Sequence, residues 1–211
     1  MSRLFKTVGG ARAHHGAMRN AYAHMTECAA ECARVARAAG TPLAPSAPTP
    51  CGDWDLRQLV NHWVLYTAYG LEHRALRTPI PDELTARDFT AGPDWAGSYA
   101  RRLDRAVAAW SDPAVWEGDI DTGHGSSPAR EIAGMLTVEA ALHGWDVATA
   151  TGGEFRLSDP AAADVLEIVE ASAALYRKYE GFAAEVPPPP GGSAFERALA
   201  LSGRDPRRAA V

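Results

Sequence analysis

Residues 127–152, SPAREIAGMLTVEAALHGWDVATATG, are the stretch that most constrains how this chain can fold. Ser127 is suited to cap a helix whose first position is Pro128, because proline has no N–H group to leave unbonded there. The glycine pair at 152–153 supplies a stop signal. Apolar side chains recur between these ends at helical spacing: Ile132, Leu136 and Val147. The stretch therefore predicts one long helix packed against a core.

Two side chains that can carry chemistry lie on the same stripe of this helix. Glu139 and His143 are four residues apart, so one is expected one helical turn above the other. A carboxylate on a core-facing stripe must be hydrogen-bonded, neutralised or bound to a cation, because an unpaired buried charge is very costly. The pair therefore predicts half of a metal site, although the spacing is also compatible with a solvated or hydrogen-bonded pair.

The remaining apolar periodicity predicts an all-α fold, a four-helix bundle with long crossover connections plus C-terminal helices. We expect a single domain over residues 14–206, a loose arm at 1–13 and a polar tail at 207–211. The acidic stretch 111–126 is interpreted as an irregular loop, and no strand is predicted. The other helices are expected at about 14–39, 55–77, 94–110, 159–179 and 195–201.

The second of these helices begins with a complete capping signal. Asp55 is the expected N-cap and Gln58 its partner three residues later, which together form a capping box. Trp54 and Leu59 occupy the flanking apolar positions that often accompany such a box. His62 follows on the same face as Leu59, so the sequence predicts that its imidazole points toward the bundle interior or its edge.

His62 is the candidate partner of Glu139 and His143. Two histidines and one carboxylate leave coordination positions open, which a catalytic metal site requires and a structural site does not. His73 is not expected to join them, because eleven residues place it about 16 Å from His62 along a helix axis. The sequence thus predicts a metal site made by His62, Glu139 and His143.

Three further residues are candidates near this site. Asp146 follows His143 by three residues, and it either orients that imidazole or forms a cap or salt bridge near the helix end. His124, in a glycine-flanked loop, is a candidate fourth ligand or proton carrier. Cys51 stands just before a helix N-terminus, a place that favours reactive thiols. Because no basic partner is visible in the sequence, we interpret Cys51 as structural.

The charge and composition exclude several classes of function. A net charge of −5 and the absence of a basic run argue against a nucleic-acid partner. No apolar stretch approaches the roughly 20 residues of a membrane span, and residues 1–20 lack the apolar region of a signal peptide. Three cysteines are too few for a disulfide framework. We therefore expect a cytoplasmic protein with a small-molecule substrate, and its oligomeric state is left open.

Two sequence strings give a more specific indication. Residues 49–62, TPCGDWDLRQLVNH, and 138–152, VEAALHGWDVATATG, resemble an actinobacterial metal-binding family. That family is related to the N-terminal domain of mycothiol-dependent maleylpyruvate isomerase and, more distantly, to DinB-like proteins. The ending at 195–206, FERALALSGRDP, is similar to that of its short members, and the resemblance covers roughly 15–206. It implies a DinB-like four-helix bundle.

The resemblance also implies a cofactor and a chemistry. In the family a divalent ion, usually zinc, is bound by the histidine of the NH motif and by the glutamate and histidine of the E-x-x-x-H-G-W-D motif. These positions are His62, Glu139 and His143 here, and the same donor types also suit nickel or iron. Relatives use mycothiol or bacillithiol as a cosubstrate, which the metal converts to a nucleophile.

The predicted function is accordingly a metal-dependent S-transferase or thiol-assisted isomerase that acts on a small electrophilic metabolite with a mycothiol-like thiol. One alternative is a metal-activated hydrolase, in which water takes the open position of the metal. Another alternative is a non-catalytic ligand-binding protein that contains the metal.

Overall fold

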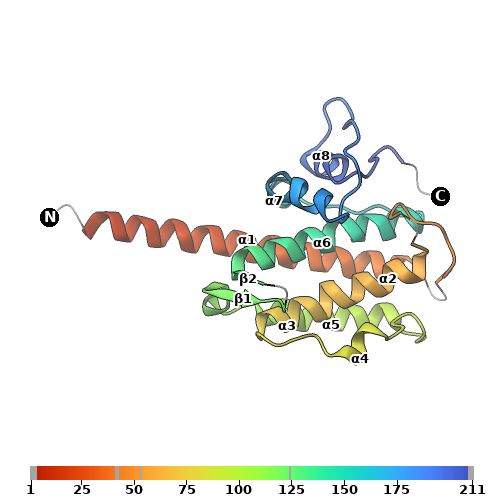
Figure 1. Cartoon of the computed structure of the whole chain (residues 1–211), viewed down its shortest axis with the longest axis horizontal. Coiled ribbons are helices and arrows are strands. Elements are labelled where there is room, and N and C mark those ends of the chain that lie inside the picture. Colours follow the sequence, from red (N-terminus) through yellow and green to blue (C-terminus); the bar gives the residue numbers. More distant parts are fainter. Residues whose placement is uncertain (1–3, 41–42, 53, 124, 209–211) are drawn as a thin grey trace.

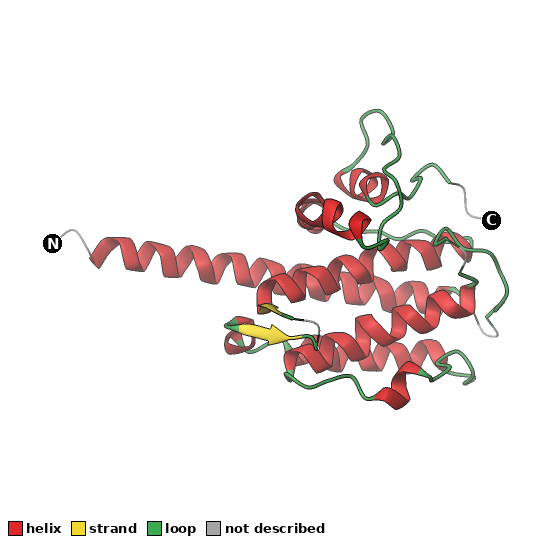
Figure 2. Ribbon diagram, viewed as in Figure 1, coloured by secondary structure: helices red, strands yellow, loops and turns green. Residues whose placement is uncertain are grey.

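The computed structural model describes residues 4–40, 43–52, 54–123 and 125–208, and for residues 4–15 and Ala17 it describes the backbone only. The described chain is predominantly helical (Figures 1 and 2), which confirms the predicted all-α fold. The bundle is built from four helical segments: α1 (Leu4–Ala38), the continuous run of α2 (Leu56–Val64), η1 (Leu65–Gly70) and α3 (Leu71–Ala75), then α5 (Trp95–Ala109), and α6 (Ala129–Ala150).

The long helices α1 and α6 form the centre of the bundle. Helix α1 packs against both α5 and α6, and the run from α2 to α3 packs against the same two helices. Two C-terminal helices, α7 (Asp159–Lys178) and α8 (Ala194–Leu201), pack on each other, and α7 covers α6 and α1 on one side of the bundle (Figure 1). A short helix, α4 (Asp82–Thr85), lies in the crossover before α5.

Helix α1 begins earlier than its sequence indicated. The structure starts it at Leu4, ten residues before the expected start at residue 14, so residues 4–13 of the expected arm are helical. Glycines 9 and 10 lower the helix propensity there but do not end the helix. In Figure 1 this end of α1 extends past the other helices.

The second helical run confirms the predicted capping box and adds a feature that was not predicted. Asp55 Oδ1 accepts a 2.8 Å hydrogen bond from the N–H of Gln58, whose Oε1 accepts one from the Asp55 N–H at 3.0 Å. Seven residues after Gln58, the π-helical segment Leu65–Gly70 begins between α2 and α3. A π turn contains about one residue more than an α turn, so it shifts the faces of all later residues.

The connection between α5 and α6 is more ordered than the irregular loop that we predicted. A 3₁₀ helix, η2 (Pro113–Trp116), leads into an antiparallel pair of strands, β1 (Asp119–Asp121) and β2 (Ser126–Pro128). Ile120 of β1 pairs with Ser127 and is buried in the core. Strands of three residues are too short to show the alternation by which strands are recognised.

The hairpin also corrects the predicted start of α6. Ser127 is paired in β2 and does not cap the helix, which begins at Ala129 with Pro128 in the cap position. The predicted end is confirmed, because Gly152 has a φ of 75° and the Gly153 N–H bonds to the Ala148 carbonyl at 2.8 Å.

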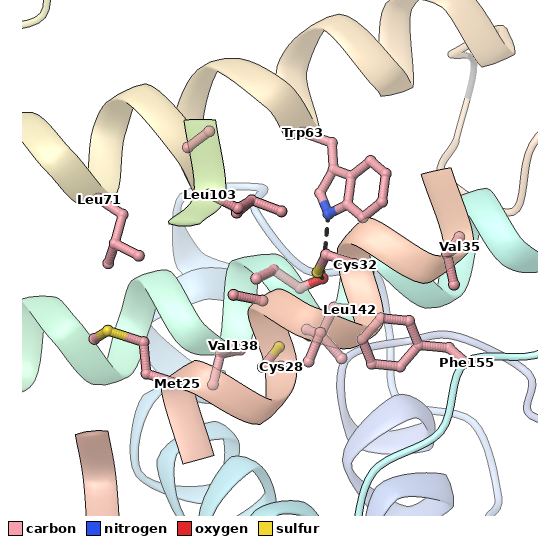
Figure 3. Close-up of a cluster of buried hydrophobic side chains, with 14 of the residues drawn as sticks. Met25, Cys28, Cys32, Val35, Trp63, Leu71, Leu103, Val138, Leu142 and Phe155 are labelled. Carbon is pink, nitrogen blue, oxygen red and sulfur yellow. Dashed lines mark hydrogen bonds between the residues drawn. The ribbon is translucent and has the colours of Figure 1, made fainter. Parts of the chain in front are cut away.

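The core between α1, α2 and α6 contains an apolar stripe of α1, made by Met25, Cys28, Cys32 and Val35 (Figure 3). Trp63 is fully buried among these side chains, and its Nε1–H donates a 3.2 Å hydrogen bond to the carbonyl of Ala140 (Figure 3). The residue after His62 is therefore bonded to the residue after Glu139. This contact fixes α2 against α6 at the level of the candidate site.

The C-terminal helices differ from the predictions in detail. Ser158 caps α7, whose Val165 and Val169 are buried, whereas Leu175 is 57% exposed although it lies at helical spacing from them. Ser193 forms a capping box with Glu196 at the start of α8. Among the described residues, none of the helices combines the length and apolar character that a bilayer crossing requires.

Candidate metal centre

The three predicted ligands converge between α2 and α6. Nε2 of His62 lies 2.5 Å from Oε1 of Glu139, and Nε2 of His143 lies 3.3 Å from the same oxygen. One ligand atom from each of the three residues lies within 4.8 Å of the other two. The geometry therefore places both imidazoles around a single carboxylate oxygen, which makes the three groups candidates to share one cation.

Aromatic rings hold the two imidazoles in place. Trp54 lies with its ring 4.6 Å from that of His62 and 6.0 Å from that of His143, while Tyr66 lies 4.6 Å from His62 on α2. The two imidazoles themselves meet edge to face at 4.9 Å. These contacts restrict the rotation of His62 and His143, so the ligand atoms are held in position before any ion binds.

A buried ion pair lies behind His143. Nδ1 of His143 donates a hydrogen bond to Oδ2 of Asp146 at 3.0 Å, and the fully buried Asp146 also accepts hydrogen bonds from Arg204. With Nδ1 as the donor, Nε2 of the imidazole is the atom that faces Glu139. This is the arrangement by which carboxylates usually orient histidine ligands. The contacts match both roles considered for Asp146, because it bonds to the imidazole of His143 and also forms a salt bridge with Arg204.

The charges of these groups are strongly coupled. Burial alone would raise the pKa of Glu139, but the adjacent His143 and His62 lower it well below its usual range. Burial lowers the pKa of His143, yet Glu139 and Asp146 together raise it well above 6.5. Burial likewise opposes ionisation of Asp146, while Arg204 and His143 lower its pKa. In the metal-free protein a proton on His143 therefore balances the anionic carboxylates.

These residues fit a divalent cation. When Nδ1 donates to Asp146, Nε2 of His143 faces the Glu139 carboxylate at 3.3 Å with either a second proton or a cation between them. Two imidazole nitrogens and one carboxylate oxygen are the donors of open sites for zinc, iron and nickel. A metal ion would thus take the place of the proton and satisfy the same three atoms.

The candidate centre lines a cavity of about 780 Å³. Besides the ligands, the wall includes Trp54 and Cys51 from the segment before α2, Tyr176 from α7 and Arg204 from the segment after α8. A cavity of this volume is large enough for a small-molecule ligand. The C-terminal segment therefore closes one side of the space in front of the candidate ligands.

Cys51 lies closer to the candidate centre than its interpretation as a structural residue implied. Its Sγ forms a second potential ligand cluster with His143 and Asp146, all within 4.8 Å of one another. Arg204 already supplies the positive charge to Asp146 in that cluster, so the set with Glu139 is the better cation site.

Two other histidines were considered for this centre. His124 lies outside the described residues, so its expected role as a fourth ligand or proton carrier stays a prediction. His73 bonds to Thr78 at the surface, away from His62, as its spacing indicated. Arg204 and Tyr176 were missed, because neither forms a local pattern with the motifs on α2 and α6.

The fold and the site together define a helical-bundle protein with a candidate metal centre of two histidines and one glutamate. The chain belongs to the family described as the mycothiol maleylpyruvate isomerase N-terminal domain, whose model matches residues 25–148. This match confirms the family that the sequence strings indicated. All three candidate ligands lie within the matched range, whereas Arg204, Tyr176 and helices α7 and α8 lie outside it.

Curated relatives agree with an actinobacterial family. The uncharacterized proteins MT0763 and Rv0738, from the CDC 1551 / Oshkosh and ATCC 25618 / H37Rv strains of Mycobacterium tuberculosis, are each 28% identical to this chain over 166 residues. Each match covers 76% of this chain and 85% of the relative. No solved structure matches the chain significantly.

Proposed function

We propose that the protein is a divalent-metal-dependent enzyme that uses a mycothiol-like thiol as a nucleophile, either as an S-transferase or as a thiol-assisted isomerase. The observation that carries this proposal is the convergence of His62, Glu139 and His143 beside a cavity of about 780 Å³. Membership of a family named for a mycothiol-dependent reaction supports the choice of a thiol. Zinc is the ion we expect, with nickel and iron as alternatives.

The chemistry follows from what each group supplies. A divalent ion bound by the three ligands would lower the pKa of an incoming thiol, so that a thiolate is available at neutral pH. Asp146 keeps Nε2 of His143 directed at the site, and Arg204 keeps Asp146 ionised. The ring of Trp54 lies against both imidazoles and forms part of the wall beside them.

Tyr176 adds a hydrogen-bond donor to the cavity wall. Burial and the nearby Glu139 carboxylate raise the pKa of Tyr176 to about 12, so its hydroxyl stays protonated at neutral pH. Its ring is stacked on Phe182 at 4.7 Å, which holds the side chain on the wall. A protonated phenol in this position is suited to bind an oxygen atom of the substrate.

Metal content and thiol-dependent turnover test the proposal together. The purified chain should contain about one divalent ion, and it should join mycothiol or bacillithiol to a chromogenic electrophile such as 1-chloro-2,4-dinitrobenzene, with release of chloride. His62→Ala should lose both the ion and the activity. The matched control His73→Ala, at the surface near the end of the same helical run, should keep both.

Cys51→Ser tests whether the nucleophilic sulfur comes from the cosubstrate or from the protein. The variant should keep its thiol-dependent activity if the cosubstrate supplies the sulfur. Turnover of ester or amide substrates without added thiol would instead support the hydrolase. Ligand-induced thermal shifts without any thiol-dependent product would support a non-catalytic binding protein. A metal-free preparation of unchanged stability, with the three ligands intact, would contradict the proposal.

A further inference from the structure

A second, smaller cavity also reaches the candidate centre. Its volume is about 300 Å³, and it lies between α6 and the run from η1 to α3, beside the β1–β2 hairpin. It shares part of its wall with the larger cavity: His62, Met135, Glu139 and Tyr176. The candidate ligands His62 and Glu139 therefore border both cavities, and a molecule in either cavity can approach them.

The π-helical segment brings a cation into this smaller cavity. In an uninterrupted α-helix the residue on the face of His62 three turns later is His73, as its spacing of eleven residues indicates. The π segment Leu65–Gly70 contains about one extra residue, so Arg74, and not His73, lies on the face of His62 three turns later. The structure agrees, because His62, Tyr66 and Arg74 line the cavity, while His73 turns to Thr78 at the surface.

Within the described part of the chain, the guanidinium of Arg74 bonds to a backbone carbonyl and not to a carboxylate. Its Nη1 donates to the carbonyl of Asp121 at 3.3 Å, and among the residues that the structure describes no carboxylate pairs with it. By contrast, Arg102 nearby is paired with Glu72 at 2.7 Å. The other walls of the cavity are largely apolar, with Ile132, Leu136 and Met135 from α6. A half-buried guanidinium in such surroundings favours binding of a carboxylate or phosphate, which it can bond in a bidentate manner.

We propose that the smaller cavity is a separate subsite for the second substrate, in which Arg74 binds an anionic group, a carboxylate or a phosphate ester. This inference rests on the proposed function, because it assigns the larger cavity to the thiol. Arg74 follows His62 by roughly three helical turns, about 16 Å along the axis. The anionic group of the substrate must therefore be several bonds away from the carbon that reacts at the centre.

Equilibrium binding of matched probes tests the subsite without any turnover. Hexanoate, hexyl phosphate and the neutral hexanamide share a chain and differ in the head group, and calorimetry on the full chain gives their affinities. We expect at least one of the two anions to bind about tenfold more tightly than the amide, because hydrogen bonds to charged groups are the stronger ones. The preferred anion then distinguishes a carboxylate from a phosphate substrate.

The variants assign the preference to Arg74. Arg74→Gln should remove the preference for the anion, whereas Arg74→Lys, which keeps the charge, should retain part of it. Arg57→Gln is the matched control, because Arg57 is an exposed arginine of α2 outside both cavities and its loss changes the net charge equally. Removal of any bound metal ion with a chelator should leave the preference unchanged, because the anionic group is assigned to Arg74 and not to the metal.

Several results would overturn the inference. Equal binding of the anions and hexanamide would do so, as would a preference that survives Arg74→Gln. A preference that disappears after chelation, but persists in Arg74→Gln, would show that the anion binds the metal instead. Failure of the proposed function has a different signature, namely no thiol-dependent product while the preference conferred by Arg74 remains.

Discussion

The guanidinium of Arg204 and the carboxylate of Asp146, 58 residues apart in the chain, are joined by hydrogen bonds of 2.7, 2.9 and 3.1 Å. Both groups are buried, and Asp146 also accepts a hydrogen bond from His143, a candidate metal ligand. The segment after α8 is therefore bonded, through one carboxylate, to the candidate centre on α6. The C-terminal part of the chain thus belongs to the site even though the family match ends before it.

The first prediction concerns the orientation of His143. Asp146→Asn should weaken metal binding about 10- to 100-fold, the usual effect of removing the hydrogen-bond partner of a histidine ligand. The asparagine amide keeps the volume but loses the charge that stabilises the Nδ1–H tautomer. Competition with a chromogenic chelator at fixed pH measures the change.

Asp94→Asn is the control for this prediction. Asp94 forms an exposed ion pair with Arg101 at 2.9 Å at the start of α5, far along the chain from the three ligands. The control should bind the metal as the parent does. Equal affinities of the parent and Asp146→Asn would show that Asp146 does not orient His143.

The second prediction concerns the stability of the buried pair. Arg204→Met removes the arginine that pairs with a fully buried carboxylate and leaves Asp146 only its bond to His143, so we expect a loss of about 3–5 kcal/mol in the free energy of unfolding. The double variant Asp146→Asn/Arg204→Met should recover part of that loss, because no uncompensated charge remains. Urea denaturation of the metal-free proteins measures both values. Arg207→Met, which removes an exposed pair with Asp205, should leave the unfolding midpoint unchanged.

The third prediction concerns pH in the metal-free protein. Because Glu139 and Asp146 raise the pKa of His143 above 6.5 in the folded state, protonation of this imidazole stabilises the fold. That contribution is complete below pH 6.5 and is lost as the pH rises through the raised pKa. Glu139 and Asp146 have lowered pKa values, so their ionised forms stabilise the fold at neutral pH. This contribution is lost as the pH falls below about 4. Imidazole resonances followed by NMR across pH 5–10 measure the His143 titration.

Metal binding should displace the same proton. A divalent ion needs Nε2 of His143 unprotonated, so binding at pH 7 should release about one proton for each ion bound. Calorimetric titration with zinc in two buffers of different ionisation enthalpy measures this number. Apparent heats that are independent of the buffer would contradict the coupled network of Glu139, His143 and Asp146.

The parts of the fold that sequence predicted are those that local chemistry decides. The capping box of Asp55 and Gln58 and the glycine stop after α6 are properties of a few adjacent residues, and both are present. The candidate ligand set was proposed from sequence because Glu139 and His143 share a helical stripe. Glu139 and His143 lie close to His62 because α2 and α6 face each other in the bundle.

The features that sequence missed depend on contacts between distant residues. The π segment lies in a run that packs against α5 and α6, and it places Arg74 instead of His73 on the face of His62. Arg204 follows a helix whose own sequence gives no sign of Asp146. A buried aspartate predicts a cation, but nothing local indicates which of the chain's arginines supplies it.

The last prediction compares two glycines of the same helix, Gly134 and Gly144. An alanine Cβ at Gly134 would lie 3.1 Å from the terminal carbon of Ile168, a partly exposed side chain that can rotate away. A Cβ at Gly144 would lie 2.8 Å from one ring carbon of Phe155 and closer still to another. The ring of Phe155 is buried and packs at 5.7 Å from that of Phe195 on α8, so it has no room to move.

Gly134→Ala should therefore raise the free energy of unfolding by up to about 1 kcal/mol, because alanine is the better helix former. Gly144→Ala should lower the free energy of unfolding by about 1–3 kcal/mol, since the cost of overpacking against Phe155 is larger than the gain in helix propensity. Urea denaturation measures both changes. Because Phe155 transmits the displacement to α8 and so to the segment that holds Arg204, Gly144→Ala should also weaken zinc binding, whereas Gly134→Ala should not. Two variants with equal stability and equal zinc affinity would show that the packing of Phe155 is not coupled to the site.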